Sequence, residues 1–288
     1  MERERLPIKL ALPDGFLSAE TRCGYDISAR VKRIWAVELD LLSQFQRVCA
    51  KHEIQYVALW GTALGAVRHR GFIPWDDDID VGMDRENYKK FCKIASREFE
   101  HPYFFQNPYT DKKFFAPLAR LRNSNTTALI KGFDSPDYNN GIYIDIDILD
   151  GLACSKIEWQ LQNFLKHIAL VPIKMRAPFY RLWIDVYARV RCMYNGKTDR
   201  MGISYSFLES DWNSWISREE YAYAYNREFE FMDIKVPCNC ECYLKRVFGE
   251  WRSFPKNNER GRWHAGQIYF DPDLPYGELL RKGHEVNK

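Results

Sequence analysis

Two short segments in which aspartate alternates with isoleucine or valine constrain the fold of this chain more than any other feature. Residues 78–81 read DIDV, and residues 141–151 read GIYIDIDILDG. Successive side chains of a β-strand point to opposite faces of its sheet. If both segments are strands, their apolar side chains enter a core while their aspartates share the opposite surface. The chain is therefore expected to form a sheet with one apolar face and one acidic patch.

The aspartates of these segments are candidate ligands of a divalent cation. Like charges at contact distance repel by roughly 1 kcal/mol per pair in water, and by more where water is scarce. Asp76, Asp77, Asp78 and Asp80 crowd into five positions, so a cation is expected among them. Mg²⁺ is held by one or two carboxylates together with water and substrate phosphates. Two acids on one strand and a third on a neighbouring strand, such as Asp145, suit metal-assisted phosphoryl transfer, because negative charge builds on the phosphate oxygens.

A glycine and a hydroxyl group ahead of the acids predict a phosphate-binding turn. Gly61 and Thr62 break the apolar run IQYVALW, and a short helix over ALGAVRH is expected to begin at this break. Glycine lets backbone N–H groups approach a phosphate closely, and the N-terminus of a helix favours anions. Arg68 and His69 supply further cationic donors a few residues later.

The same acids do not fit a calcium loop. An EF-hand that began at Asp76 would place Val81 where glycine is required, and one that began at Asp145 would place Leu149 at a ligand position. A solvated acidic surface is the other alternative. The alternation with apolar residues argues against it, because charge on a half-buried strand is costly without a partner.

The periods of the remaining apolar residues indicate an α+β fold. A helix is predicted from Asp26 to about His52, and Asp84 is expected to cap a second helix. Several strands follow up to Gly151, beyond which helix signals dominate, so a mostly helical addition is expected to complete the active site. The expected divisions are an irregular arm over 1–25, a catalytic core over 26–151 and the addition over 152–288.

Three signals place helices in the C-terminal part. Ser155 with Glu158, and Ser217 with Glu220, have the spacing of capping boxes, in which the two side chains satisfy backbone donors at a helix start. Gly249 is expected to end the last helix, over ECYLKRVF.

Composition argues against several classes of protein. Lys plus Arg number 42 against 39 Asp plus Glu, which does not favour a nucleic-acid partner. The first residues, MERERLPIK, lack the apolar region of a signal peptide, and no apolar run approaches the roughly 20 residues that cross a bilayer. With eight scattered cysteines, a cytoplasmic location is expected, and contact with the inner face of the cell membrane is left open.

Two further patterns leave alternatives open. Cys238, Cys240 and Cys242 alternate in PCNCEC, whereas structural zinc sites favour pairs two residues apart with a distant second pair, so the spacing is poor for zinc. A segment near Pro178 to Tyr194 carries basic residues interleaved with apolar ones, which is typical either of a solvated helix face or of a helix at a membrane surface.

One long segment identifies a family. Residues 60–91, WGTALGAVRHRGFIPWDDDIDVGMDRENYKKF, resemble the LicD family, which includes bacterial phosphocholine transferases and, more distantly, the fukutin-type glycan phosphotransferases of animals. ARLRNSNT at 119–126, GIYIDIDILDG at 141–151 and KVPCNCECYLKRVFG at 235–249 are also similar to the family. The resemblance implies a nucleotidyltransferase core of the polymerase-β type, which is a mixed sheet flanked by helices.

The resemblance also implies roles for the acids. Asp78 and Asp80 would be the metal pair, and Asp145 would be the third acid, which takes the proton from an acceptor hydroxyl. This chain reads DIDILD where DIFPLD is usual, so Asp147 stands where phenylalanine is common. Whether Asp147 shares the role of Asp145 is left open, and Asp145 is preferred.

The donor-binding residues follow from the same resemblance. Gly61 and Thr62 would match the turn that holds the donor phosphates, and His264 is a further candidate to contact them. A quaternary ammonium group is attracted to aromatic faces by about 0.5 to 2 kcal/mol, which makes Trp60 and Trp75 candidate choline-binding residues, with a place in the core as the alternative.

The implied activity moves phosphocholine, or a related phospho-alcohol, from a CDP-linked donor such as CDP-choline to a hydroxyl of a cell-surface glycan. CMP would be released, and Mg²⁺ or Mn²⁺ would be the cofactor. The acceptor would be a glycan or a lipid-linked glycan, of the kind found in lipopolysaccharide or teichoic acid. Two alternatives are a true nucleotidyltransferase that attaches a nucleotide to a small molecule, and a catalytically dead glycan-binding relative.

Overall fold

Strand β8 (Ile142–Gly151) is the central strand of the largest sheet. It pairs in parallel with β4 (Asp80–Asp84) and, along its other edge, antiparallel with β6 (Ala119–Asn123). The computed structural model describes residues 6–114, 116, 118–130, 138–175, 179–202, 212–256 and 268–278. The other strands of this sheet are β3 (Val57–Ala58) next to β4, β5 (Tyr103–Gln106) next to β6, β9 (Arg200–Gly202) next to the end of β8, and β10 (Trp215–Ser217) next to β9.

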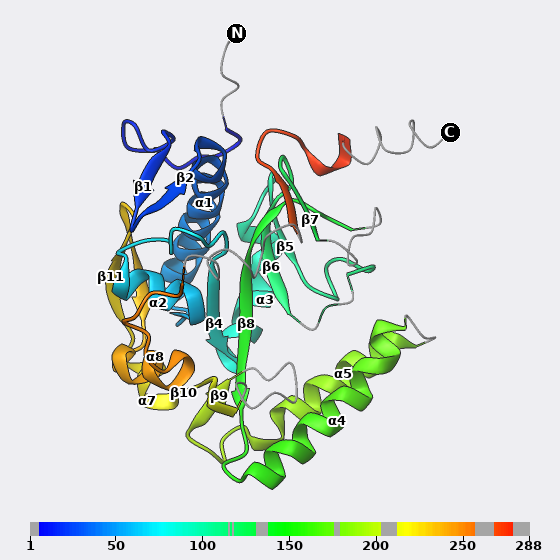
Figure 1. Cartoon of the computed structure of the whole chain (residues 1–288). Coiled ribbons are helices and arrows are strands. Elements are labelled where there is room, and N and C mark those ends of the chain that lie inside the picture. Colours follow the sequence, from blue (N-terminus) through cyan, green and yellow to red (C-terminus); the bar gives the residue numbers. More distant parts are fainter. Residues whose placement is uncertain are drawn as a thin grey trace.

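Helices α1 (Ala29–Lys51) and α3 (Arg85–Glu98) pack against this mixed sheet (Figure 1). The predicted cap at Asp84 is confirmed, because its side chain accepts a hydrogen bond from Asn87 N–H in the first turn of α3. The predicted start of α1 at Asp26 is wrong, since Asp26 belongs to a short strand and Ser28 caps the helix instead. The short helix α2 (Trp60–Arg68) links β3 to β4. An α+β fold with a mixed sheet flanked by helices is therefore confirmed.

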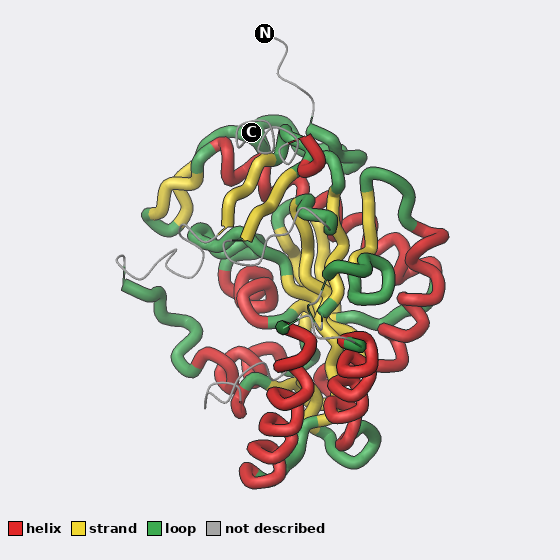
Figure 2. The backbone as a smooth tube through the Cα atoms, turned by 90° about the vertical axis from the view of Figure 1, so that its right-hand side faces the viewer, coloured by secondary structure: helices red, strands yellow, loops and turns green. Residues whose placement is uncertain are grey.

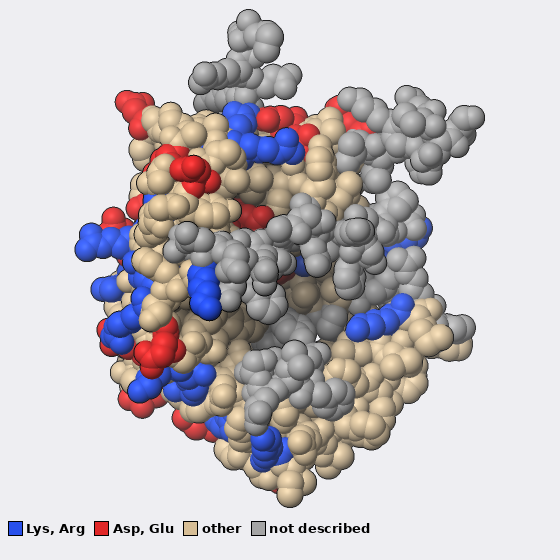
Figure 3. Space-filling view, in the orientation of Figure 1, with Lys and Arg blue, Asp and Glu red and all other residues tan. Residues whose placement is uncertain are grey.

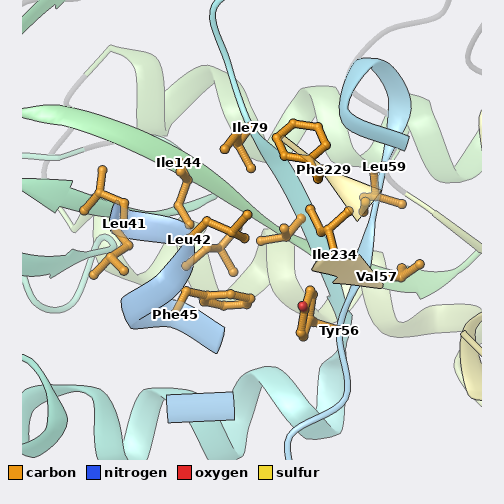
Figure 4. Packing of buried hydrophobic residues seen from close by; sticks show 14 of the residues in the cluster. Leu41, Leu42, Phe45, Tyr56, Val57, Leu59, Ile79, Ile144, Phe229 and Ile234 are labelled. Atoms are coloured by element: carbon orange, nitrogen blue, oxygen red, sulfur yellow. The ribbon is translucent and has the colours of Figure 1, made fainter. Parts of the chain in front are cut away.

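The apolar side chains of the alternating segments enter the core, as expected. Ile79 and Ile144 are completely buried, and they point toward Leu41, Leu42 and Phe45 of α1 (Figure 4). Fully burying such side chains contributes about 1.5–3 kcal/mol each, so the apolar face fixes which side of β4 and β8 turns outward. The aspartates of both segments are thereby held on the other face.

The remaining elements surround this sheet, and Figure 2 shows the strands gathered between helices. Two antiparallel hairpins and one pair of distant strands lie outside it. The elements are β1 (Glu20–Arg22), β2 (Tyr25–Ile27), β7 (Thr127–Ile130), α4 (Lys156–Lys174), α5 (Tyr180–Arg191), η1 (Cys192–Tyr194), α7 (Arg218–Ala222), β11 (Tyr225–Phe229), β12 (Met232–Val236), α8 (Cys240–Phe248) and β13 (Ile268–Asp271). None of the helices in the described ranges has both the length and the apolar character needed to cross a bilayer.

The structure corrects the expected start of one strand. β4 begins at Asp80, so Asp78 precedes the strand instead of belonging to it. Asp145 N–H nevertheless donates to the Ile79 carbonyl at 2.9 Å. The contact between the two segments therefore begins at Ile79, one residue before β4.

The N-terminal arm is not irregular throughout. Glu20–Arg22 and Tyr25–Ile27 form a hairpin whose turn places Cys23 and Gly24 at positive φ, a conformation that glycine adopts at little cost. The mostly helical character of residues 152–288 is not confirmed either, because β9 to β13 alternate there with the helices.

The two predicted capping boxes differ. Ser217 and Glu220 form both reciprocal hydrogen bonds at the start of α7. Ser155 precedes α4 as predicted, but its side chain accepts no capping hydrogen bond. Gly249 ends α8 with a φ of 66°, as expected for a glycine cap.

Asp150, near the end of β8, is a buried acid that is fully occupied by partners. Arg85 Nε and Asn195 Nδ2 donate to its Oδ1 at 2.9 and 3.0 Å, and Arg191 Nε lies 2.9 Å from its Oδ2. Burial would raise the pKa of Asp150, but the charge of Arg191 and the hydrogen bond from Arg85 outweigh it and hold the pKa below its ordinary value.

The Asp150→Asn substitution is expected to lower the free energy of unfolding by about 3–5 kcal/mol, because it leaves buried arginines without their counter-charge. Urea denaturation followed by circular dichroism measures this. The exposed pair of Arg252 and Glu241 provides the control, since Glu241→Gln should change stability by no more than about 1 kcal/mol.

The pH dependence supplies a second check on Asp150. Since the native pKa is lowered, the stabilisation is present above the ordinary pKa of about 3.9 and is lost as the pH falls through the native value. The difference between wild type and Asp150→Asn should therefore shrink in acid. Equal effects of Asp150→Asn and Glu241→Gln at neutral pH would contradict the assignment.

Candidate functional site

Three charged residues stand side by side across the polar face of the sheet. Asp80 of β4 is the register partner of Asp145 of β8, and Asp145 is in turn paired with Arg120 of β6. Neighbouring strands lie about 4.8 Å apart, and directly opposed residues have their side chains on the same face. The sheet therefore places an acid, a second acid and an arginine in one row.

Arg120 is the partner of Asp145 and was not singled out from the sequence. Its Nε donates to Asp145 Oδ1 at 2.7 Å, and its guanidinium lies 3.8 Å from the centre of the Tyr143 ring. Burial would lower the pKa of Arg120, but the charge of Asp145 raises it above its ordinary value. The alternation in ARLRN gave a signal for an outward-facing arginine, but only the register of β6 against β8 shows which acid it meets.

Further carboxylates gather around Asp80. Burial raises the pKa of Asp80 well above its ordinary value, and the charges of Asp78, Asp147 and Asp145 add to the rise. Burial and the charge of Asp77 raise the pKa of Asp76 to about 7. We call these residues, with Glu38, the acid cluster: Glu38, Asp76, Asp77, Asp78, Asp80, Asp145 and Asp147.

Glu38 is a member of the cluster that sequence reasoning missed. It lies in the middle of α1, its residue is 1% exposed, and its Oε2 has no hydrogen-bond partner. Burial raises the pKa of Glu38 well above its ordinary value, and the charges of Asp77 and Asp78 raise it further. The signal was present, because Glu38 shares the buried helix face with residues three and four positions away.

The arrangement and the chemistry of the acid cluster can be compared with what a hard divalent cation requires. In the described parts of the chain, no three His, Cys, Asp or Glu side chains already converge on one point as metal ligands do, and Asp145 is engaged by Arg120. The donor chemistry does fit, since all the groups are carboxylates, neighbouring acids raise the pKa of Glu38 and of Asp80, and the Glu38 Oε2 has no hydrogen-bond partner. Binding of Mg²⁺ or Mn²⁺ at the acid cluster thus stays a prediction, and the Arg120 contact engages Oδ1 of Asp145.

The N-terminus of α2 adjoins the cluster, with Gly61 and Thr62 in its first turn. A Cβ atom on Gly61 would lie 2.8 Å from Asp76 Oδ2, so a larger residue here would displace the Asp76 carboxylate. The buried Thr62 hydroxyl accepts a hydrogen bond from Asp80 N–H at 2.8 Å. Thr62 therefore fixes the start of β4 in this structure, and its contact with a donor phosphate stays a prediction.

Arg68 and His69 lie at the other end of α2. With a rise of 1.5 Å per residue, about 12 Å of helix separates His69 from Gly61. Arg68 Nη1 donates to the Trp251 carbonyl at 2.6 Å, and Arg68 Nε lies 2.9 Å from His69 Nε2. Burial lowers the pKa of His69 to about 4, so this imidazole is neutral at pH 7.

The expected phosphate-binding set is therefore divided between the two ends of α2, because Gly61 and Thr62 lie in the first turn of this nine-residue helix and Arg68 is its last residue. His264, the remaining member of the set, lies outside the described residues. Asp147 is 2% exposed and is the register partner of Gly82, so it lies deeper in the sheet than Asp145.

The two candidate tryptophans have different surroundings. Trp60 N–H donates to Tyr243 Oη at 3.0 Å and its indole Nε1 donates to Ser214 Oγ at 2.7 Å, which ties it to the protein framework. Trp75, which precedes the first aspartate of the cluster, lies in a partly exposed group of rings. Their centroids are 5.9 Å away for Tyr25, 5.9 Å for His69 and 6.1 Å for Phe254.

The three alternating cysteines do not share one environment. Cys240 is 3% exposed at the start of α8, whereas Cys242 is exposed. Cys238 Sγ lies 3.6 Å from the Glu219 carbonyl. These positions supply no support for a zinc site within the described residues.

Comparisons with known proteins point to one family. The profile of the LicD/FKTN/FKRP family, nucleotidyltransferase domain, matches residues 53–147. The chain is similar to the lipopolysaccharide cholinephosphotransferase LicD of Haemophilus influenzae, with 23% identity over 269 residues that cover 80% of this chain and 94% of that protein. It is also similar to uncharacterized proteins of Rickettsia typhi, 43% identical over 72 residues that cover 23% of each chain, and of Rickettsia prowazekii, 45% identical over 70 residues that cover 24% of each.

The Glu38→Gln substitution is expected to stabilise the metal-free protein, because it removes a carboxylate from a buried group of like charges. In mildly alkaline, metal-free buffer the gain should be about 1–3 kcal/mol, which raises the thermal midpoint by ~2–4 °C per kcal/mol. Differential scanning calorimetry measures it, with the exposed Glu250→Gln as control. A Glu38→Gln protein less stable than wild type would show that the carboxylate is satisfied within the fold.

Proposed function

We propose that this chain transfers phosphocholine, or a related phospho-alcohol, from a CDP-linked donor to a hydroxyl of a cell-surface glycan. The match of residues 53–147 to the profile of the LicD-family nucleotidyltransferase domain supports this proposal. The single observation that carries the proposal is the acid cluster, whose members Asp78, Asp80 and Asp145 lie within the matched domain. The similarity to a lipopolysaccharide cholinephosphotransferase over most of both chains favours phosphocholine as the transferred group.

The proposed fold is a polymerase-β-type core. Its support is the parallel pair of β4 and β8, which carries acids on one face, together with α2, whose first turn adjoins them. In that interpretation residues 26–151 hold the catalytic core, and residues 152–288 complete the site around it.

Each acid has a defined place in the proposed reaction. Asp78, Asp80 and Asp145 would hold Mg²⁺ or Mn²⁺, and the ion would neutralise the donor diphosphate. The acceptor hydroxyl gives its proton to Asp145 as its oxygen bonds to the distal phosphorus, and the bond from that phosphorus to the CMP oxygen breaks. Arg120 positions Asp145 through its hydrogen bond to Oδ1 of that carboxylate.

The rings around Trp75 support choline as the alcohol. Tyr25, Trp75 and Phe254 are partly exposed, and Asp76 follows Trp75 directly. Aromatic faces beside a carboxylate attract a quaternary ammonium group. Trp60, which is hydrogen-bonded through both its backbone N–H and its indole N–H, is the weaker of the two tryptophan candidates.

The test of the reaction is to incubate the protein with CDP-choline and Mg²⁺ or Mn²⁺ and to follow CMP release. A product that retains CMP would identify the alternative, a true nucleotidyltransferase. A chain that never turns over any CDP-alcohol with either metal would favour the third possibility, a catalytically dead glycan-binding relative.

Asp78→Ala is expected to reduce transfer by at least about 100-fold while the far-ultraviolet circular dichroism spectrum is unchanged. The reason is the loss of several kcal/mol of charge stabilisation in the transition state. The exposed Asp14→Ala serves as the control. Unaltered turnover of Asp78→Ala with added metal would refute its role, and a comparison of Asp145→Asn with Asp147→Asn shows which of the two carboxylates the reaction requires.

Trp75→Leu is expected to raise KM for CDP-choline by about 2- to 30-fold, which corresponds to the 0.5–2 kcal/mol of a cation–π contact. The value of KM for CDP-glycerol, whose alcohol is neutral, should not change. Steady-state kinetics with the two donors separates these outcomes. An equal increase for both donors would mean that Trp75 supports the fold of the site instead of the ammonium group.

A further inference from the structure

Helices α4 and α5 form a hairpin with a small core of its own. The two helices lie side by side and project from the sheet at the lower right of Figure 1. Their shared core contains Ala169, Leu170 and Ile173 of α4 with Ile184 and Tyr187 of α5, and it is separate from the main core. The hairpin therefore uses one face of α4 to hold itself together.

The opposite face of α4 is apolar and exposed. Its six large apolar side chains recur at alternating steps of four and three residues, which keeps them within about 40° of one line along the helix. We call it the α4 stripe: Ile157 79%, Leu161 53%, Phe164 54%, Ile168 46%, Val171 54% and Met175 75% exposed. Phe179, which precedes α5, and Leu182 of α5 are also exposed, by 83% and 62%.

This concentration distinguishes the hairpin from the rest of the surface. More than half of the large hydrophobic side chains that the described residues expose lie on the hairpin. In Figure 3 this part of the molecule is largely free of charged side chains. Single exposed apolar residues are ordinary, but a contiguous apolar patch marks a surface that meets a protein or a membrane.

The charges at the border of the stripe indicate which partner it fits. Four exposed cationic residues lie on the two helices, whereas only Glu158 and Asp185 are acidic, and Asp185 accepts a hydrogen bond from Tyr109. Lys156 and Lys174 both lie about 100° from the centre line of the stripe, on the same side of α4. The cationic residues are Lys156, Lys174, Arg181 and Arg189.

The charge pattern favours a lipid surface over a second copy of the chain. Two copies packed stripe against stripe would bring cations toward cations, with few acids to pair them, and like charges in contact oppose association. A bilayer with anionic headgroups supplies the missing negative charge and accepts the apolar side chains at the same time. No described helix crosses a membrane, so such a contact would lie in the plane of the interface.

We propose that the α4–α5 hairpin docks this protein on the surface of a bilayer that contains anionic lipids. The α4 stripe enters the boundary between headgroups and acyl chains, while Lys174, Arg181 and Arg189 meet the anionic headgroups. The docking is independent of the transfer reaction, because the hairpin contributes none of the acid cluster.

Vesicle co-sedimentation of the full chain at low salt tests the proposal, with vesicles of phosphatidylcholine alone and of phosphatidylcholine mixed with phosphatidylglycerol. The expected result is binding to the mixed vesicles that weakens as salt is added. The triple substitution Leu161→Ser, Phe164→Ser and Ile168→Ser should weaken it at least about tenfold. The pair Lys174→Glu and Arg181→Glu should weaken binding to the mixed vesicles by a similar factor.

Tyr223→Ser is the matched control, since Tyr223 is 72% exposed and lies outside the hairpin. Its binding should equal that of wild type, and the thermal midpoints of all variants should stay close to the wild-type value because the substituted side chains are exposed. Absence of binding to mixed vesicles at low salt, or an equal loss in Tyr223→Ser, overturns the proposal. A wild-type dimer in analytical ultracentrifugation that the triple substitution dissolves, without vesicle binding, would show that a second copy covers the stripe.

Discussion

The parallel pairing of β4 with β8 is the constraint on which the site depends. It sets Asp80 directly beside Asp145, and it does so because the isoleucines on the reverse side of both segments are completely buried against α1. A shift of one residue would turn Ile79 and Ile144 outward and the aspartates inward. Burial of the apolar side chains therefore holds several carboxylates close together. The repulsion between these carboxylates destabilises the metal-free fold.

Asp150, near the end of β8, and Asp80, at the start of β4, have opposite electrostatic environments. Asp150 has its charge matched by Arg85 and Arg191, and its pKa is lowered. Asp80 meets mainly other carboxylates, and its pKa is raised. Arginine side chains thus neutralise the charge of Asp150. The carboxylates around Asp80 favour the binding of a cation from solution. Arg120 supplies only part of that charge, through its contact with Asp145.

Sequence patterns predicted the elements around the site better than the contacts within it. The helix that ends near His52 and the cap at Asp84 follow from local periodicity and capping chemistry, and both are present. The proposed phosphate-binding set followed from closeness along the chain. Each residue of a helix advances the chain by about 1.5 Å along the helix axis. Arg68 and His69 therefore lie at the opposite end of α2 from Gly61.

The sequence alone determined which side chains face inward and which face outward on β4 and β8, because alternation has a period of two in any strand. It also determined that carboxylates of both segments would need positive charge nearby, and it carried the resemblance to the LicD family. Only the tertiary structure decided that Glu38 of α1 joins these acids and that Arg120 meets Asp145. It also left the α4 stripe uncovered. The physical reason is that helix phase against a sheet, strand register and hairpin orientation result from packing between distant segments, which no local pattern encodes.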